Sequence, residues 1–163
     1  MSCDYSGTSF SMGGPKHTVA EKTSDKPQGA MVVIGGNRGI GLDLVKQLKS
    51  RGDEVIATTR KPEPKLTELG ATVVEGIDIC NAESLTSLAT ACEKGVAVLV
   101  VNAGLLEAGS DTKKLPDMTE ADLEAFTREW HVNCLGALRV VSLLSKHLAE
   151  NACRASGNNF VFV

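Results

Sequence analysis

The chain has 163 residues, a formal net charge of −3, and 42% hydrophobic and 23% charged residues. This length suits one domain with a sizeable core, and the charge gives no reason to expect a nucleic-acid partner. No apolar run approaches the roughly 18–20 residues that cross a bilayer, so we predict no membrane span. The five cysteines are scattered without a C-x-x-C pair, and the three histidines are dispersed. This pattern predicts reduced thiols in a cytoplasmic protein and no metal site.

Residues 1–29 differ in composition from the rest of the chain. Nearly half of them are Ser, Thr, Gly or Pro and they show no apolar periodicity, so we predict a disordered N-terminal extension. The segment has no apolar core of a secretory signal. Its serines suit an organelle transit peptide, but Asp4, Glu21 and Asp25 and the lack of Arg before Arg38 argue against one. We therefore predict a cytoplasmic location, with organelle targeting by this segment as the alternative.

From residue 30 onward, apolar runs alternate with helical patterns. The predicted strands cover 30–34, 54–59, 71–76, 96–101 and 159–163. The predicted helices cover 40–51, 65–69, a segment that Asn81 can cap, and a long stretch from 120 to 150. Short connections and right-handed crossovers then predict an α/β fold with a doubly wound parallel sheet in the order 3-2-1-4-5.

Two helices carry apolar faces that can be assigned from spacing. In the first helix, Ile40, Leu44, Val45 and Leu48 are spaced to share one face. Thr119 and Asp122 form a capping-box pattern that opens the long helix. The predicted apolar stripe of that helix consists of Cys134, Leu138, Val141, Leu144, Ser145 and Leu148.

Three glycines, Gly35, Gly39 and Gly41, stand between the first strand and the first helix. Glycine permits a tight turn and lets the backbone approach a phosphate closely, and a helix N-terminus attracts the anion. The alternative is a glycine-rich turn that binds nothing, which the placement of all three glycines between strand and helix disfavours. The turn therefore predicts a dinucleotide pyrophosphate site.

Residues 31–163 resemble the N-terminal two-thirds of a short-chain dehydrogenase/reductase, most closely its carbonyl-reductase-like branch. The segments that carry the resemblance are Gly-Gly-Asn-Arg-Gly-Ile-Gly-Leu (35–42), Val-Ile-Ala-Thr-Thr-Arg (55–60) and Val-Asn-Ala-Gly (101–104). The resemblance implies a Rossmann dinucleotide-binding domain over 30–163 and carbonyl reduction by hydride transfer in a full-length protein. It also implies a catalytic role for Asn133. The cofactor contacts that it implies, with Arg60 added from the charge pattern, are Gly35, Asn37, Arg38, Gly39, Ile40, Gly41, Arg60, Asp78, Asn102, Ala103 and Gly104.

The end of the second strand predicts which cofactor is preferred. An NAD site usually places Asp or Glu there, for the ribose 2′-hydroxyl. Here the strand ends Thr58-Thr59-Arg60, and Arg38 lies in the glycine turn. Arginine binds phosphate oxygens in a bidentate, charge-assisted manner, so the pair predicts NADPH over NADH. A lone exposed Arg60 that is merely solvated is the alternative.

The catalytic set of the resembled family is the main departure. Those enzymes have a Ser beyond strand five and then Tyr-x-x-x-Lys, whereas the one tyrosine here is Tyr5. Two hypotheses follow. In the first, the domain is C-terminally incomplete, truncated after strand five, and is inactive by itself. In the second, the chain is a non-catalytic scaffold or accessory subunit, with a protein partner covering strand five, whose apolar edge runs Phe160-Val161-Phe162-Val163.

Overall fold

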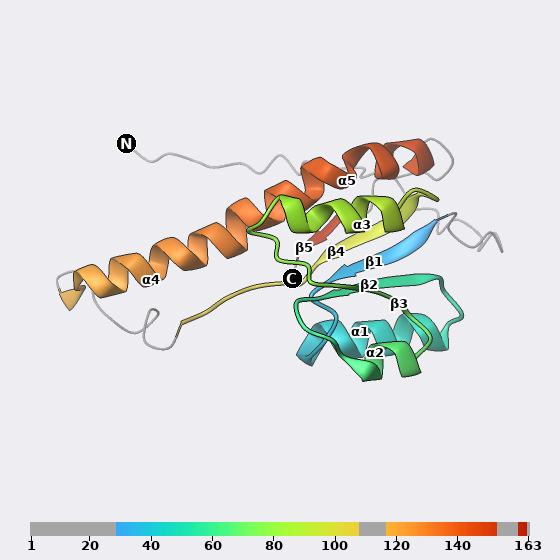
Figure 1. Cartoon of the computed structure of the whole chain (residues 1–163), viewed down its shortest axis with the longest axis horizontal. Coiled ribbons are helices and arrows are strands. Elements are labelled where there is room, and N and C mark those ends of the chain that lie inside the picture. The colour runs from blue at the N-terminus through green and yellow to red at the C-terminus, as the bar shows by residue number, and fades with distance from the viewer. Residues whose placement is uncertain (1–28, 108–116, 153–159, 163) are drawn as a thin grey trace, which may run out of the picture.

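The computed structural model describes residues 29–107, 117–152 and 160–162 (Figure 1). Residues 1–28 of the predicted 1–29 extension, and most of the loop before the long helix, lie outside these residues. The elements, in chain order, are β1 (Ala30–Ile34), α1 (Gly39–Ser50), β2 (Val55–Thr59), α2 (Pro64–Glu68), β3 (Thr72–Glu75), η1 (Glu83–Leu85), α3 (Thr86–Ala91), β4 (Val96–Val101), α4 (Glu120–Trp130), the π-helical η3 (His131–Gly136), α5 (Ala137–Ala152) and β5 (Phe160–Phe162).

The five strands form one sheet in the order β3-β2-β1-β4-β5, and every neighbouring pair is parallel. The predicted order is therefore confirmed. Val33 lies at the centre of the register, opposite Ala57 of β2 and Val100 of β4. Because all strands run the same way, their carboxyl ends meet at one edge of the sheet, where ligands bind in open α/β folds.

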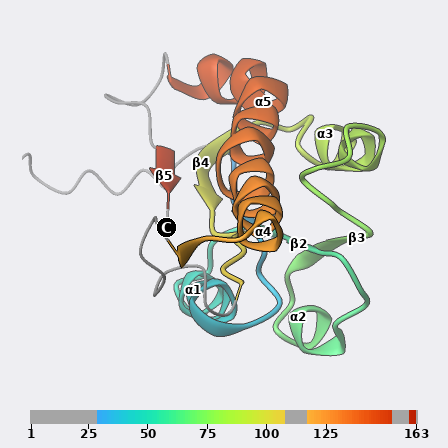
Figure 2. The same cartoon turned by 90° about the vertical axis from the view of Figure 1, so that its left-hand side faces the viewer.

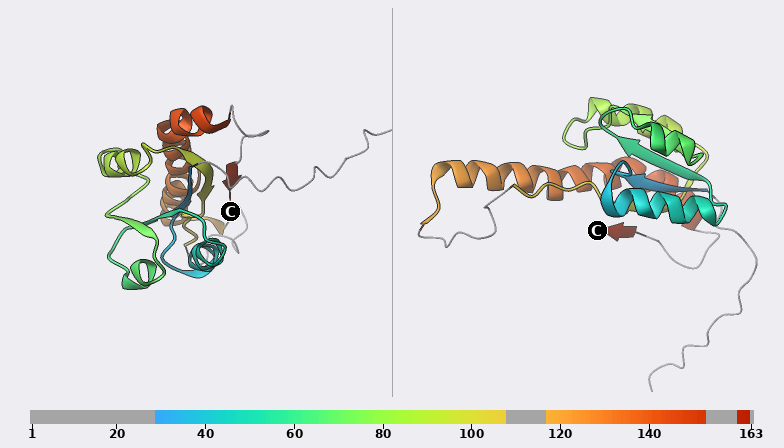
Figure 3. Two further views of the ribbon diagram at one scale, coloured as in Figure 1. Left: turned by 90° about the vertical axis from the view of Figure 1, so that its right-hand side faces the viewer. Right: turned by 90° about the horizontal axis from the view of Figure 1, so that it is seen from below.

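Helices cover both faces of the sheet, with α1 and α2 on one side and α3 and α5 on the other (Figures 2 and 3). Adjacent residues of β1 point into the two resulting cores. Val32 belongs to the cluster under α3 and α5, and Val33 belongs to the cluster under α1 and α2. Both side chains are fully buried, as expected for a central parallel strand covered on both faces.

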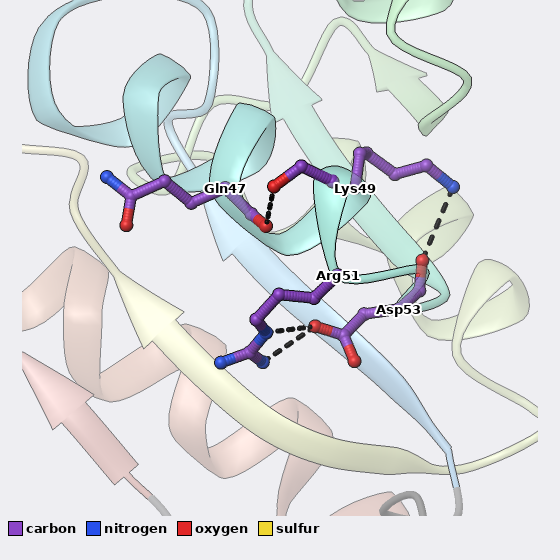
Figure 4. Close-up of polar contacts among 5 residues, drawn as sticks. Gln47, Lys49, Arg51 and Asp53 are labelled. Carbon is purple, nitrogen blue, oxygen red and sulfur yellow. Dashed lines mark hydrogen bonds and ion pairs between the residues drawn. The ribbon is translucent and has the colours of Figure 1, made fainter.

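The α1–β2 connection is fixed at the opposite, amino edge of the sheet (Figure 4). Arg51 donates from Nε and Nη2 to Oδ2 of Asp53, at 2.8 and 2.6 Å. Lys49 donates from Nζ to the Asp53 carbonyl oxygen at 3.3 Å. Gly52 has a φ of +78° after the last turn, which is the left-handed helix stop predicted for it.

The helix faces differ in part from the predicted ones. On α1 the buried residues are Gly41, Val45 and Leu48, while Ile40 is 66% exposed. The prediction that Ile40 shares the buried face is wrong, because that face is defined by Gly41, Val45 and Leu48, and Ile40 lies about 100° around the helix from Gly41.

The long helix also differs, and its register explains the difference. Thr119 and Asp122 form the predicted capping box. The helix then passes through the π-helical η3 into α5, whose buried residues are Ala137, Val140, Leu144 and Leu148. Leu138 precedes Leu144 by six residues in α5, which places it about 120° around the helix from the buried face. Leu144 and Leu148 are buried as predicted, but Leu138 is 61% exposed and Val140 takes a buried position. The assignment of Leu138 to the buried stripe is wrong.

Candidate functional site

Four of the five parallel strands bring the predicted cofactor residues to the carboxyl edge of the sheet. The glycine turn follows β1, Arg60 follows β2, Asp78 lies beyond β3, and Asn102 follows β4. Asn133 reaches this edge from η3, on the long helix. Segments up to about a hundred residues apart in sequence therefore supply one site.

The glycine turn is fixed by hydrogen bonds to the strands on either side of β1. Gly35 donates its N–H to Thr58 Oγ1 at 3.1 Å, and Gly36 donates to the Thr58 carbonyl at 3.0 Å. On the other side, Asn102 donates from Nδ2 to the Gly35 carbonyl at 2.9 Å. Thr58 is only 2% exposed. Its role as an anchor was not predicted, although a hydroxyl at the end of a buried strand beside the turn is the signal for it.

Two glycines of the turn are required for different reasons. Gly39 has a φ of +52°, and a Cβ added there would meet no heavy atom within 4 Å. Its requirement is conformational, and the space above it is open. A Cβ added at Gly41 would lie 2.2 Å from the Gly35 carbonyl oxygen and 2.6 Å from Asn102 Nδ2. Gly41 is therefore required because α1 packs directly against the backbone of the turn, which leaves no room for a side chain.

No side chain caps the N-terminus of α1, so its first backbone N–H groups stay available to a ligand. Arg38 occupies the N-cap with an extended backbone, and no side-chain hydrogen bond caps the helix. No acidic residue lies in the first turn. The first N–H groups of a helix have no intrahelical partner and carry the positive end of its dipole. Together with the open space above Gly39, this end of α1 has the properties of an anion site.

Charged side chains flank the turn. Arg38 and Arg60 are both exposed, and they follow the adjacent strands β1 and β2. Arg60 lies on the β3 side of the site, where its charge acts on the thiol of Cys80. Burial and the Asp78 carboxylate raise the pKa of that thiol, and Arg139 and Arg60 oppose the rise. Asp78 itself is exposed, and its Oδ1 accepts the Cys80 N–H at 2.9 Å.

Ser84 holds the backbone of the Asp78 turn. Its Oγ accepts the Asp78 N–H at 3.0 Å and donates to the carbonyls of Asp78 and Asn81, both at 2.8 Å. Asn81 Oδ1 accepts the Glu83 N–H at 3.0 Å at the start of η1. The N-cap of η1 is Ala82 and that of α3 is Leu85, neither with a side-chain cap, so the prediction that Asn81 caps the third helix is wrong. The turn presents the Asp78 carboxylate at the sheet edge.

Asn133 pairs with the backbone beyond β4. Its Nδ2 donates to the Leu105 carbonyl, and its Oδ1 accepts the Leu105 N–H, both at 2.8 Å. The side chain therefore joins η3 to the segment that starts with Asn102, Ala103 and Gly104. These contacts do not test the catalytic role predicted for Asn133, which stays a prediction.

The model of the family described as short chain dehydrogenase matches residues 29–161. The chain belongs to this family. A Rhodococcus sp. protein (strain AD45), 1-hydroxy-2-glutathionyl-2-methyl-3-butene dehydrogenase, is 31% identical over 125 residues, which are 75% of this chain and 52% of that protein. The 3-oxoacyl-[acyl-carrier-protein] reductase MabA of Mycobacterium bovis is 36% identical over 126 residues, 75% of this chain and 46% of the reductase. This short-chain dehydrogenase family chain therefore spans about half the length of the curated relatives it matches.

Solved structures of the family show the same fold. A short-chain dehydrogenase/reductase from Burkholderia multivorans with bound NADP superposes with a TM-score of 0.62 at 25% identity, covering 74% of this chain and 54% of that one. The NADH-dependent reductase A1-R′ complexed with NAD gives a TM-score of 0.64 at 20% identity, covering 82% and 58%. Both nicotinamide cofactors thus occur among the structural neighbours of this family member.

A surface pocket of about 450 Å³ lies away from the proposed cofactor site. It is lined by Leu135 of η3, by residues of α5 that include Leu138 and Arg139, and by Ala82 just before η1 and Leu85 at its end, and contains none of the predicted site residues. Within the described ranges, no group of three or more His, Cys, Asp or Glu side chains could hold a metal ion. A search of the same ranges finds no helix long and apolar enough to span a membrane.

Proposed function

We propose that this chain binds NADPH as the dinucleotide-binding domain of an oxidoreductase. The observation that carries the proposal is the glycine turn between β1 and α1, where the open space above Gly39 adjoins a helix N-terminus that no side chain caps. The pyrophosphate would lie on that terminus, and Asp78 would accept a hydrogen bond from the adenine amino group. Asn102, Ala103 and Gly104 would lie beside the adenine ribose.

The residues present fit such a cofactor. A Cβ at Gly41 would fill the contact that brings α1 against the turn, and the Thr58 and Asn102 hydrogen bonds hold the turn before any ligand arrives. The half-buried Asn37 and the exposed Ile40 are part of the turn and the start of α1, and would contact the cofactor there. When bound, the nicotinamide supplies the hydride. The protein groups named here bind and orient the cofactor.

Preference for NADPH is proposed from the charges at the sheet edge. β2 ends in two threonines and leads to Arg60, with no carboxylate for a ribose 2′-hydroxyl. Arg38 and Arg60 are both exposed, and their guanidinium groups would bind a 2′-phosphate. The neighbour with bound NADP supports this preference, and the neighbour with bound NAD supports the broader NAD(P) class.

Catalysis is proposed to need residues outside the 163-residue sequence. Asn133 is the one member of the family's catalytic set that the resemblance identifies here, and the one tyrosine, Tyr5, precedes the folded domain. The full-length oxidoreductase would reduce a carbonyl substrate by hydride transfer, and this chain alone would not turn over. A cytoplasmic location stays a prediction.

The second candidate function is a non-catalytic scaffold or accessory subunit. The observation that favours it is the place of β5 at the edge of the sheet, paired with β4 alone in the described residues. An edge strand offers its free backbone groups to another chain. In this case a protein partner would cover β5, and NADPH binding would be weak or absent.

Cofactor titration tests the proposal. The single tryptophan, Trp130, is 53% exposed on α4 and reports binding through quenching and energy transfer to the reduced nicotinamide. We expect saturable binding of NADPH, weaker binding of NADH, and no oxidation of NADPH by added carbonyl compounds. Lack of saturation with either cofactor would refute the binding function and favour the scaffold. NADPH oxidation by the purified chain would refute the claim that it is inactive alone.

A further inference from the structure

A second group of contacts joins α4 to the segment that follows β4. Glu129 accepts the Glu107 N–H on Oε1 at 2.6 Å. Arg128 donates from Nε to Glu107 Oε1 and from Nη2 to Oε2, both at 2.8 Å. We call these three residues the clasp. Arg128 and Glu129 lie about one turn before Asn133 on the long helix. Asn133 and the clasp therefore hold the segment after β4 at two successive points.

Glu129 is an unusual residue for its position. It is 8% exposed, and among the described residues only Thr58, Thr59 and Glu129 are buried polar or charged side chains. A buried carboxylate is costly unless hydrogen bonds compensate it, and its bond to a backbone N–H provides such compensation. The Arg128 guanidinium meanwhile lowers the pKa of the Glu107 carboxyl through the paired hydrogen bonds. The clasp is thus a defined geometry built from one buried carboxylate, Glu129, and one half-buried carboxylate, Glu107.

The held segment is extended alongside the long helix (Figure 1). The backbone N–H groups of Leu105 and Glu107 face the helix and bond to Asn133 and Glu129, while Leu106 between them is 70% exposed. This alternation is that of a strand, in which successive side chains point to opposite sides. The helix therefore holds the segment through polar groups at every second residue.

The same segment is connected directly to the glycine turn. It begins at Asn102, whose Nδ2 bonds to the Gly35 carbonyl. Ala103 is so close that a Cβ added at Gly35 would lie 3.0 Å from its Cα and N atoms. Movement of the segment at Glu107 would thus be transmitted over four residues to the backbone that cradles the pyrophosphate.

We propose that Glu129 and Arg128 are positioning residues for dinucleotide binding, acting on the Asn102–Gly104 wall of the site through the clasp without touching the cofactor. The inference rests on the proposed cofactor function and extends it to residues outside the binding motif. Glu129 supplies the buried anchor for the Glu107 N–H, and Arg128 fixes the Glu107 side chain. With both in place, the wall is preorganised, so the cofactor does not have to order it on binding.

Comparing Glu129→Leu with Glu129→Gln distinguishes the effect of losing the hydrogen bond to the Glu107 N–H from the effect of changing the packing around residue 129. The leucine removes the acceptor, whereas the glutamine oxygen can accept the same N–H. Glu93→Leu is the matched control, because Glu93 is exposed before β4, at the amino edge of the sheet. NADPH dissociation constants are measured by calorimetry at a temperature where each variant is folded, and hydrogen exchange of the Glu107 amide is followed in parallel.

The expected results differ among the three variants. Glu129→Leu should weaken NADPH binding about fivefold or more, the lower end of typical coupling between sites, and should accelerate exchange of the Glu107 amide. Glu129→Gln and Glu93→Leu should leave both quantities close to wild type. Unchanged affinity in Glu129→Leu with normal binding by wild type would overturn the clasp alone. Equal losses in Glu129→Leu and Glu129→Gln would overturn the hydrogen-bond explanation.

The ion pair gives an independent test that does not rely on the folding of Glu129→Leu. Arg128→Glu should weaken NADPH binding, and the exchanged pair Arg128→Glu with Glu107→Arg should restore it at least in part. Failure of the exchanged pair to restore affinity would overturn the role of Arg128. A wild-type chain that binds neither NADPH nor NADH would instead refute the proposed function, and the positioning role with it.

Discussion

Replacing Gly39 with alanine distinguishes a phosphate cradle from an ordinary tight turn. Its φ of +52° is left-handed, and an added Cβ would meet no heavy atom within 4 Å. The folding cost is therefore conformational, about 1–2 kcal/mol for a side chain in this region. For a domain of this size, that cost lowers the melting temperature by about 2–8 °C. The methyl group would occupy the open space where the backbone must approach the pyrophosphate.

Gly70→Ala is the matched control. Gly70 has a φ of +73°, its added Cβ would lie 3.7 Å from Lys49 Cε, and it stands between α2 and β3 at the amino edge of the sheet. Both variants should lose similar stability in thermal unfolding. Only Gly39→Ala should lose NADPH affinity, at least tenfold or about 1.4 kcal/mol. A folded Gly39→Ala variant that binds NADPH like Gly70→Ala would refute the assignment of this turn to a phosphate.

Three further predictions concern the cofactor, the core and a thiol. Arg60→Glu should lower the ratio of NADPH to NADH affinity about tenfold or more, measured by titration, and an unchanged ratio would contradict the 2′-phosphate role. Leu99 on β4 is fully buried, so Leu99→Ala should cost about 2–5 kcal/mol in denaturant unfolding, whereas Leu106→Ala at an exposed site should cost under about 0.5 kcal/mol. Burial raises the pKa of the Cys92 thiol from 9.0 to about 11. Because the folded state holds this proton more tightly, the contribution is complete below pH 9 and is lost as the pH rises toward 11. Unfolding free energies across that range should therefore fall more steeply for wild type than for Cys92→Ala, and equal slopes would contradict the shift.

The elements whose signals are local were predictable from the sequence. β1 and β4 have the predicted bounds, because each is an uninterrupted apolar run that ends at a turn. The Thr119–Asp122 capping box and the stop at Gly52 also formed as predicted, since both depend on residues within one turn of a helix end. The strand order followed from connection length and crossover handedness, which are general to such sheets.

Features that depend on tertiary contacts were not predictable in the same way. The π-helical turn η3 has no compositional signal in a single sequence, and the apolar residues of α5 offered two overlapping faces, of which the packing buries the one with Val140, Leu144 and Leu148 and exposes Leu138. Thr58 looks like any strand threonine until β1 and β2 are in register, and only then does its hydroxyl meet the Gly35 N–H. Glu129 lies in a run of polar helix residues and is buried only because the segment after β4 returns alongside it.

The site combines two kinds of recognition, and they differ in how firmly the fold fixes them. The proposed pyrophosphate cradle is made of backbone groups, held by Thr58 on one side and Asn102 on the other. Such a cradle cannot distinguish NADPH from NADH, because both carry the same pyrophosphate. The distinction must come from side chains, and Arg38 and Arg60 are exposed on segments that leave the sheet. If the proposed function holds, cofactor class would be set by the backbone of the turn, whereas cofactor choice would be set by two exposed side chains that can change without disturbing it.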